Sequence, residues 1–296
     1  QRNLLMRLVT YSVGPAGPAR AGVRVGHRVL DIEAASRVNG EPMASSLKAL
    51  LVAGRGAISR VQALAKAATT DARPLTQAMH EERAIRFLPP VPEADTILGI
   101  EGNCPRRNGE ATKGKAAQDP ATFSMSAAGF AGHDAKLALP AGISCGEFGP
   151  ALVFVIGRTA AGVSADDALD YVAGVTILNR YAGADPKGAG PSPGSLGPEI
   201  VTMDEFADPG EMWLICTVNG EEFLRVNTRD QAWTMPEVLA HVTRKHALEP
   251  GDMYSTGAFL AQGGAADRKL EPGDVVECSI EGVTTLRTTI AAPAPD

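Results

Sequence analysis

The apolar run Leu152–Ile156 most constrains the fold, because five consecutive apolar residues that end at Gly157 are typical of a buried β-strand. Just before this run, Gly149 and Ala151 lie two residues apart, so they face the same side of an extended chain. Two carboxylates at these positions could bind one cation. Glycine and alanine offer no ligand atoms, so the strand has the frame of a metal site without its ligands.

Besides this strand, further recognisable motifs occur along nearly the whole chain. They are Met6–Tyr11, Ala21–Gly26, Val29–Glu33, Ile97–Asn103, Phe148–Gly157, Ile177–Arg180, Leu196–Glu205, Val218–Glu221, Leu248–Gly257 and Leu270–Glu277. Together they resemble the fumarylacetoacetate hydrolase family. The resemblance implies an α+β, mostly β fold, with a rolled β-sheet catalytic domain over residues 94–292. A small N-terminal α/β domain would occupy residues 6–86.

The resemblance also identifies the positions of the missing ligands. Members of the family carry two Glu in this strand and one Asp after the next strand, and the three hold Mg²⁺ or a similar ion. The matching residues here are Gly149, Ala151 and Arg180. None supplies the hard oxygen ligands that Mg²⁺ requires, so we expect no metal and no other cofactor. The formal charges of three carboxylates and one Mg²⁺ sum to about −1, whereas the formal charge of these three residues is about +1, from Arg180.

Arg180 is the first candidate catalytic residue. A guanidinium stays charged and presents a planar fork of donors, so it could stabilise an enolate oxygen directly. In the alternative interpretation Arg180 pairs with Asp185 or Glu147 and fills the vacated space.

Further candidates follow from the family's acid–base motifs. Its His-x-x-Glu element falls on Arg107–Glu110, where arginine cannot shuttle protons but Glu110 could act as a base if burial raised its pKa. Asp185 matches the acid of an Ala-Arg-Asp segment, and Lys187 is the only candidate for a catalytic lysine. A solvated surface position is the alternative for Glu110 and Lys187, since charged side chains are mostly exposed.

Five residues are expected to contact the substrate. They are Arg107, Phe123, Glu147, Thr256 and Gly257. The Thr-Gly pair matches a family loop that holds a substrate carboxylate. Ala258–Phe259 replaces the Thr-Pro that follows it in the family, which favours a less polar ligand.

Composition narrows the class of partner. The chain has 296 residues and a formal net charge of −6, which gives no electrostatic reason to expect nucleic acid or an anionic membrane as partner. No apolar run approaches the roughly 20 residues of a membrane span. Four cysteines without a Cys-x-x-Cys pair, and no signal-peptide pattern, predict a cytoplasmic protein. Gln1–Leu5 precede a start-like Met6 and are interpreted as a remnant outside the fold.

Local patterns predict the elements. Residues 6–34 predict a meander of strands, and helical spacing predicts helices over 46–53, 58–68 and 236–245. Ser164 is an expected N-cap for a helix beginning over Ala165–Leu169. Gly and Pro exclude regular structure between Gly183 and Gly197, and the Pro-rich segment 87–94 marks the domain boundary. The further predicted strands are Asp95–Gly99, Leu137–Pro140, Val172–Leu178, Trp213–Val218, Phe223–Asn227 and Asp274–Ile280.

The first functional hypothesis is a metal-independent enzyme of specialised metabolism. Its substrate would be a small β-dicarbonyl, enol or keto acid. The reaction would be carbon–carbon cleavage, decarboxylation, dehydration, isomerisation or cyclisation through an enolate. Two alternatives stay open at this point: a non-catalytic paralogue that binds a ligand or an active subunit, and an ordinary Mg²⁺-dependent acylpyruvate-type hydrolase with a shifted site. The resemblance implies a homodimer.

Overall fold

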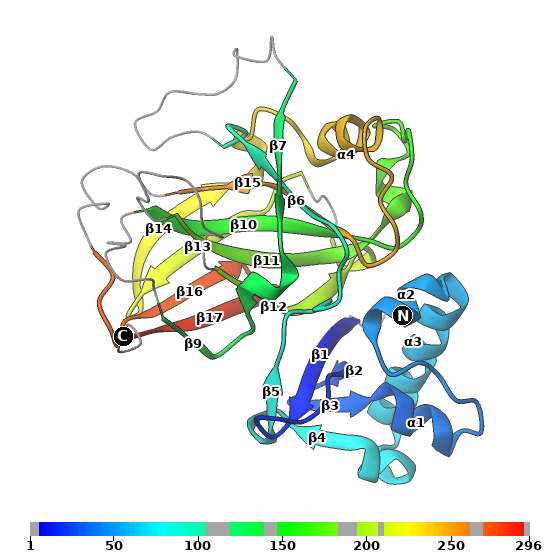
Figure 1. Ribbon diagram of the computed structural model, residues 1–296. Coiled ribbons are helices and arrows are strands. Elements are labelled where there is room, and N and C mark those ends of the chain that lie inside the picture. The colour runs from blue at the N-terminus through cyan, green and yellow to red at the C-terminus, as the bar shows by residue number, and fades with distance from the viewer. Residues whose placement is uncertain are drawn as a thin grey trace.

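A computed structural model describes residues 6–104, 119–138, 147–182, 194–206, 210–260 and 269–292. Two β-sheets dominate it, with few helices, which confirms the α+β, mostly β fold (Figure 1). The larger sheet has the strand order β4 (Met79–Glu81), β3 (Arg28–Asp31), β2 (Arg20–Val25), β1 (Arg7–Val13), β12 (Gly194–Thr202), β11 (Val172–Ala182), β10 (Glu147–Ile156), β15 (Met253–Ala258), β6 (Ile97–Glu101) and β7 (Ala121–Met125).

Two further strands attach to this sheet. β5 (Ile85–Phe87) pairs with β1, and β8 (Phe130–Ala131) runs parallel to β12. The smaller sheet has the order β14 (Glu221–Asn227), β13 (Trp213–Val218), β16 (Val275–Ile280), β17 (Thr284–Ala291) and β9 (Ala135–Ala138). The pairing of β1 with β12 joins the N-terminal strands β1–β4 to the rest of the larger sheet. The domain division near residues 87–94 stays a prediction.

Three helices gather beside the first strands (Figure 1). They are α1 (Ile32–Val38), α2 (Leu47–Val52) and α3 (Arg55–Thr70), so the two helices predicted in this region are confirmed. Asp31 begins α1, because its Oδ1 accepts the Ala34 N–H at 2.9 Å, and this cap is the signal by which the sequence could have revealed the helix. None of the described helices has the length and apolarity needed to cross a membrane.

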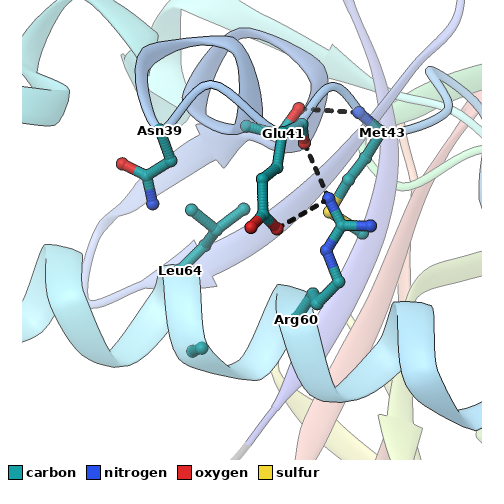
Figure 2. A pocket seen from close by; sticks show the side chains of 7 residues that line it. Asn39, Glu41, Met43, Arg60 and Leu64 are labelled. Atoms are coloured by element: carbon teal, nitrogen blue, oxygen red, sulfur yellow. Dashed lines mark hydrogen bonds and ion pairs between the residues drawn. The ribbon is translucent and has the colours of Figure 1, made fainter.

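α3 buries an apolar stripe and keeps a polar contact at its edge. Val61 and Leu64 are buried, whereas Arg60 reaches over to the loop after α1. Figure 2 shows Arg60 donating to the Glu41 carbonyl oxygen at 2.7 Å and pairing with the Glu41 carboxylate at 3.2 Å. These contacts border a small cavity of about 130 Å³ within this part of the chain.

β10 lies at the centre of the molecule and is buried on both faces. Phe154 and Ile156 enter a core shared with the smaller sheet and with α4 (Met235–Thr243), a helix the sequence also predicted. Val153 and Val155 face a second core, which the N-terminal helices complete. All four are 0% exposed, and burying each contributes roughly 1.5–3 kcal/mol. The predicted buried strand is therefore confirmed.

Two local predictions are wrong. No α-helix begins over Ala165–Leu169; the chain forms a 3₁₀ turn at Ala168–Tyr171 before it enters β11. The Ser164 hydroxyl accepts the Asp167 N–H at 3.2 Å and donates to the Asp167 carboxylate, which closes a turn rather than starting a helix. Residues 194–197 were expected to be irregular, yet they begin β12.

The pairing of β12 explains that second error. Ser195 and Leu196 pair with β11 on one side, and Gly194 and Ser195 pair with β8 on the other. A Cβ at Gly194 would lie 2.9 Å from the Phe130 ring, so the absence of a side chain permits the close approach of β8.

The sequence prediction also missed β15 and β17 as strands, although β17 alternates buried and exposed residues.

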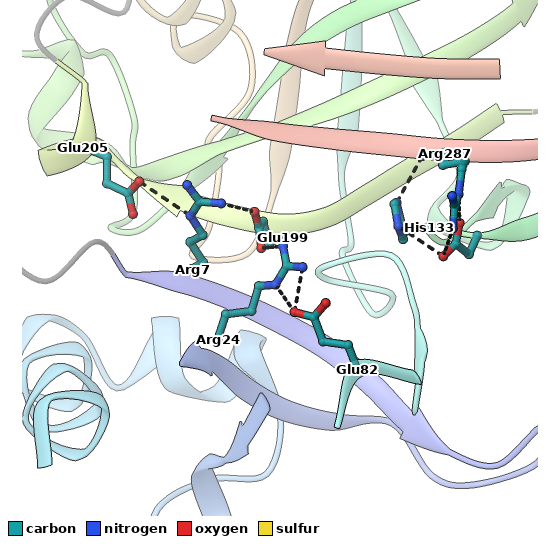
Figure 3. A network of polar contacts seen from close by, with 8 residues as sticks. Arg7, Arg24, Glu82, His133, Glu199, Glu205 and Arg287 are labelled. Carbon is teal, nitrogen blue, oxygen red and sulfur yellow. Dashed lines mark hydrogen bonds and ion pairs between the residues drawn. The ribbon is translucent and has the colours of Figure 1, made fainter. Parts of the chain in front are cut away.

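A buried carboxylate ties the N-terminal strands to β12 (Figure 3). Glu199 is 0% exposed and accepts from Arg7 at 3.3 Å and from Arg24 at 2.7 Å. Arg24 also donates to Glu82 at 2.7 Å, while Arg7 lies 3.9 Å from Glu205. The network crosses from β1 and β2 to β12, so its charges help to fix the two parts of the chain against each other.

Glu199→Gln is expected to lower the free energy of unfolding by about 3–5 kcal/mol, because it leaves two partly buried guanidinium groups without their shared anion. Urea titration of the purified protein measures the change. Glu222→Gln, which breaks a pair whose side chains are 39% and 48% exposed, is the control and should change the stability far less, because solvent screens an exposed pair. Equal losses in the two variants would contradict the role of Glu199.

Glu205 gives a pH-dependent prediction. Burial raises the pKa of Glu205 to about 7 from an ordinary value of 4.5; Arg7 opposes this shift and Glu199 adds to it. The folded state therefore keeps the proton to a higher pH than the unfolded chain. The contribution of Glu205 to stability is complete below about pH 4.5 and is lost as the pH rises to about 7. Urea unfolding across this range should show the wild type losing stability relative to Glu205→Gln. Parallel pH curves would contradict the assignment.

Candidate active site

The pairing of β10 with β11 brings together the three positions that the sequence singled out. Gly149 lies directly opposite Arg180, and Ala151 lies opposite Leu178. On its other side, Arg180 pairs with Gly194 of β12. Arg180 is thus a central-strand residue with a glycine as its neighbour on each side.

Gly149 has no room for a side chain. A Cβ at this position would lie 2.0 Å from the carbonyl oxygen of Phe259, whose N–H donates to the Pro150 carbonyl at 2.9 Å. Ala151 is 0% exposed and pairs with Ala258 of β15. A carboxylate at position 149 would collide with the backbone after β15.

These positions do not fit a divalent cation, because they supply neither oxygen ligands nor space for them. Within the described ranges, no group of three or more His, Cys, Asp or Glu residues is placed to hold a metal ion. The chemistry available at Arg180 is that of a fixed positive charge with hydrogen-bond donors.

Phe123 on β7 holds the guanidinium of Arg180. The Arg180 Cζ lies 4.7 Å from the centroid of the Phe123 ring, which is a cation–π contact. Phe123 pairs with Gly99 of β6, and its ring covers that glycine so closely that a Cβ there would be 2.2 Å from the ring. Arg180 is half-buried. The structure thus places Phe123 against Arg180, while its predicted contact with substrate stays a prediction.

Thr256 and Gly257 belong to a second polar cluster. Thr256 is 0% exposed; its hydroxyl oxygen accepts from Gln231 at 2.9 Å, and its carbonyl oxygen accepts from Asn103 at 2.6 Å. Gly257 has φ +110°, which favours glycine, and a Cβ there would lie 3.2 Å from the Cys104 sulfur. These contacts fix the last residues of β15.

Asn103 and Gln231 are site residues that sequence reasoning missed. Asn103 closes the Ile97–Asn103 motif, and its Oδ1 also accepts the Trp233 N–H at 2.6 Å. Gln231 lies 25 residues before Thr256 in the sequence, and only the fold brings the two together. No local sequence pattern therefore marks Gln231 as a site residue.

Cys104 is not prepared to act as a nucleophile. Burial raises the pKa of its thiol to about 12, against a smaller opposing effect of the hydrogen bond from Gln231. The thiol therefore stays protonated at neutral pH, whereas cysteine chemistry needs the thiolate.

β6 and the residues after it connect the two clusters. Gly99 lies under Phe123, and Asn103 and Cys104 contact Thr256 and Gly257 of β15. The backbone of Glu147 pairs with Ala182. The other sequence candidates lie outside the described residues: Arg107, Glu110, Asp185, Lys187 and the side chain of Glu147.

Comparison with known proteins decides the family. Residues 96–291 match the family described as fumarylacetoacetate (FAA) hydrolase C-terminal, which is well over half of the chain. The chain belongs to the fumarylacetoacetate hydrolase family. This confirms the resemblance seen in the sequence.

Relatives in the fumarylacetoacetate hydrolase family have several activities. The chain is 30% identical over 216 residues to a mitochondrial oxaloacetate tautomerase of Bos taurus, covering 67% of each protein. It is 32% identical over 181 residues to a 4-hydroxyphenylacetate degradation bifunctional isomerase/decarboxylase of Salmonella dublin, covering 57% of this chain and 41% of that protein. The chain thus spans less than half the length of that bifunctional relative.

Solved structures of the family share the fold. Maleylpyruvate hydrolase from Sphingobium sp. SYK-6, in complex with manganese(II) and pyruvate, has a TM-score of 0.73 at 22% identity, with 98% of this chain and 100% of that chain covered. Fumarylacetoacetate hydrolase from Exiguobacterium antarcticum has a TM-score of 0.74 at 22% identity, with 97% and 99% covered. At these identities the likeness shows the fold alone.

The close approach at Gly149 can be tested by stability. Gly149→Ala should lower the free energy of unfolding by about 1–3 kcal/mol or more, because the added methyl collides with the Phe259 carbonyl. Gly56→Ala is the matched control: Gly56 lies in the first turn of α3 with nothing within 4 Å of the added Cβ, and alanine there should not lower the stability. Urea unfolding measures both. A neutral Gly149→Ala variant would refute the close approach.

Proposed function

We propose that this chain is an enzyme that acts on small keto acids or β-dicarbonyl molecules through an enolate, without a divalent metal. The position of Arg180 opposite Gly149 carries the proposal, because a fixed cation stands in the strand pair where the family's metal ligands are expected. The activities named for its relatives, tautomerisation, isomerisation, decarboxylation and hydrolysis, support a keto-acid substrate.

The chemistry of guanidinium supports this role. A bound metal ion stabilises an enolate by placing positive charge beside its oxygen. Arg180 can place a permanent charge and two parallel N–H donors against the same oxygen, or against an adjacent carboxylate. Since the Phe123 ring lies 4.7 Å from its Cζ, the guanidinium is oriented before a substrate arrives.

The remaining assignments rest on the sequence. Glu110 or Asp185 would move the proton that forms or quenches the enolate, and Lys187 is a third catalytic candidate. Arg107 and Glu147 would contact the substrate. Thr256 and Gly257 would shape one side of the site, with Asn103 and Gln231 holding this end of β15 in place.

Arg180→Ala should lower kcat/KM at least tenfold, which equals about 1.4 kcal/mol of barrier. The assay follows enol oxaloacetate and a panel of acylpyruvates by ultraviolet absorbance, with EDTA present throughout. Arg180→Lys keeps the charge but loses the bidentate fork, so its activity should fall between the wild type and the alanine variant.

Arg158→Ala is the matched control, because the Arg158 guanidinium also lies over an aromatic ring, at 4.1 Å from Tyr171. It should keep wild-type kcat/KM. Activity that EDTA abolishes and Mg²⁺ or Mn²⁺ restores would overturn the metal-independent mechanism and favour a shifted metal site. No turnover across the panel, with tight ligand binding retained, would instead favour a non-catalytic paralogue.

A further inference from the structure

A cavity of about 720 Å³ lies between β5 and β9, and its lining includes no residue of the Arg180 and Thr256 clusters. Its charged lining consists of five cationic side chains and two acidic ones, a net charge of +3 in a chain whose net charge is −6. The cationic residues are Arg24, Arg83, Arg86, Lys136 and Arg287. The acidic residues are Glu82 and Asp134.

Close packing of the segment around Gly132 against β5 brings two sides of this cavity together. Gly132 lies against β5 so tightly that a Cβ would be 2.2 Å from the Phe87 carbonyl oxygen. This contact brings the basic residues of the β5 region beside those of β9 and β17. Phe87 is 7% exposed and stacks edge-on with the His133 ring at 5.7 Å, so a rigid aromatic contact supports the cavity lining.

Both acidic side chains are already neutralised. Asp134 accepts from two nitrogens of Arg287, and Glu82 accepts from Arg24, which also binds the buried Glu199 (Figure 3). Burial lowers the pKa of His133, so this residue adds no positive charge at neutral pH.

Three cations remain uncompensated. No ion pair forms on Arg83, Arg86 or Lys136 within the described ranges, and all three are exposed. Like charges gathered around one cavity repel each other, and an anion that bridges them removes the repulsion.

We propose that this cavity binds a small polyanion, a molecule with two or more adjacent anionic groups of the diphosphate or polycarboxylate kind. Three cations without an ion pair among the described residues match more than one negative charge, and each guanidinium can bind a phosphate or carboxylate through two parallel hydrogen bonds. No residue of the cavity belongs to the candidate active site, so this is a second binding site.

Isothermal titration of the full chain tests the proposal with three probes: inorganic diphosphate, adenosine diphosphate and citrate. At least one should bind saturably at one molecule per chain, with an affinity that falls as salt is added. The probe that binds best distinguishes an inorganic phosphate, an organic phosphate and a polycarboxylate as the source of the anion. Absence of saturable binding by all three at millimolar concentration would overturn the proposal.

The triple variant Arg83→Gln/Arg86→Gln/Lys136→Gln should weaken binding of that probe at least tenfold. Lys66→Gln/Lys245→Gln/Lys269→Gln is the matched control: it removes the same charge from exposed residues outside the cavity and should change affinity less than twofold. Equal weakening in both triples would show that net charge alone attracts the anion, which also overturns the site. Should the first triple variant fail to fold, Arg86→Gln alone should weaken binding at least threefold. An unchanged affinity in that variant would also overturn the site.

Discussion

The backbone pairing of β10 with β11 is the interaction on which the rest of the structure depends. It places the central strand between two cores, with Phe154 on one side and Val153 on the other. The same ladder sets Arg180 opposite Gly149. A slip of one residue would exchange the faces of every side chain, so the register that packs the core also fixes the candidate site.

The site keeps the family's backbone frame while the residues at the expected ligand positions differ. The backbone frame of the fumarylacetoacetate hydrolase family remains, but Phe259 crosses Gly149 at a distance that only glycine allows. The Arg180 guanidinium lies over the Phe123 ring. A cation held by an aromatic ring is compatible with the proposed enolate chemistry, since fold alone does not determine reaction.

Much of the fold was predictable because the relevant signals are local. The apolar run at Leu152–Ile156 and the helical spacing of α3 need no distant partner to be recognised. The strand at residues 194–197 was missed for the opposite reason: its Gly and Ser residues have little strand propensity, and pairing with β8 and β11 on either side overrides that preference. Gln231 was missed because its partner Thr256 is distant in sequence.

The sequence by itself determined the family, the fold class and the absence of oxygen ligands at positions 149, 151 and 180, because these are matters of residue identity in a recognisable frame. Only the tertiary structure decided that position 149 has no space for a ligand, that Phe123 orients Arg180, and that basic residues from β5, β9 and β17 meet at one cavity. Those facts depend on distances between segments far apart in the chain, and local patterns carry no information about such distances.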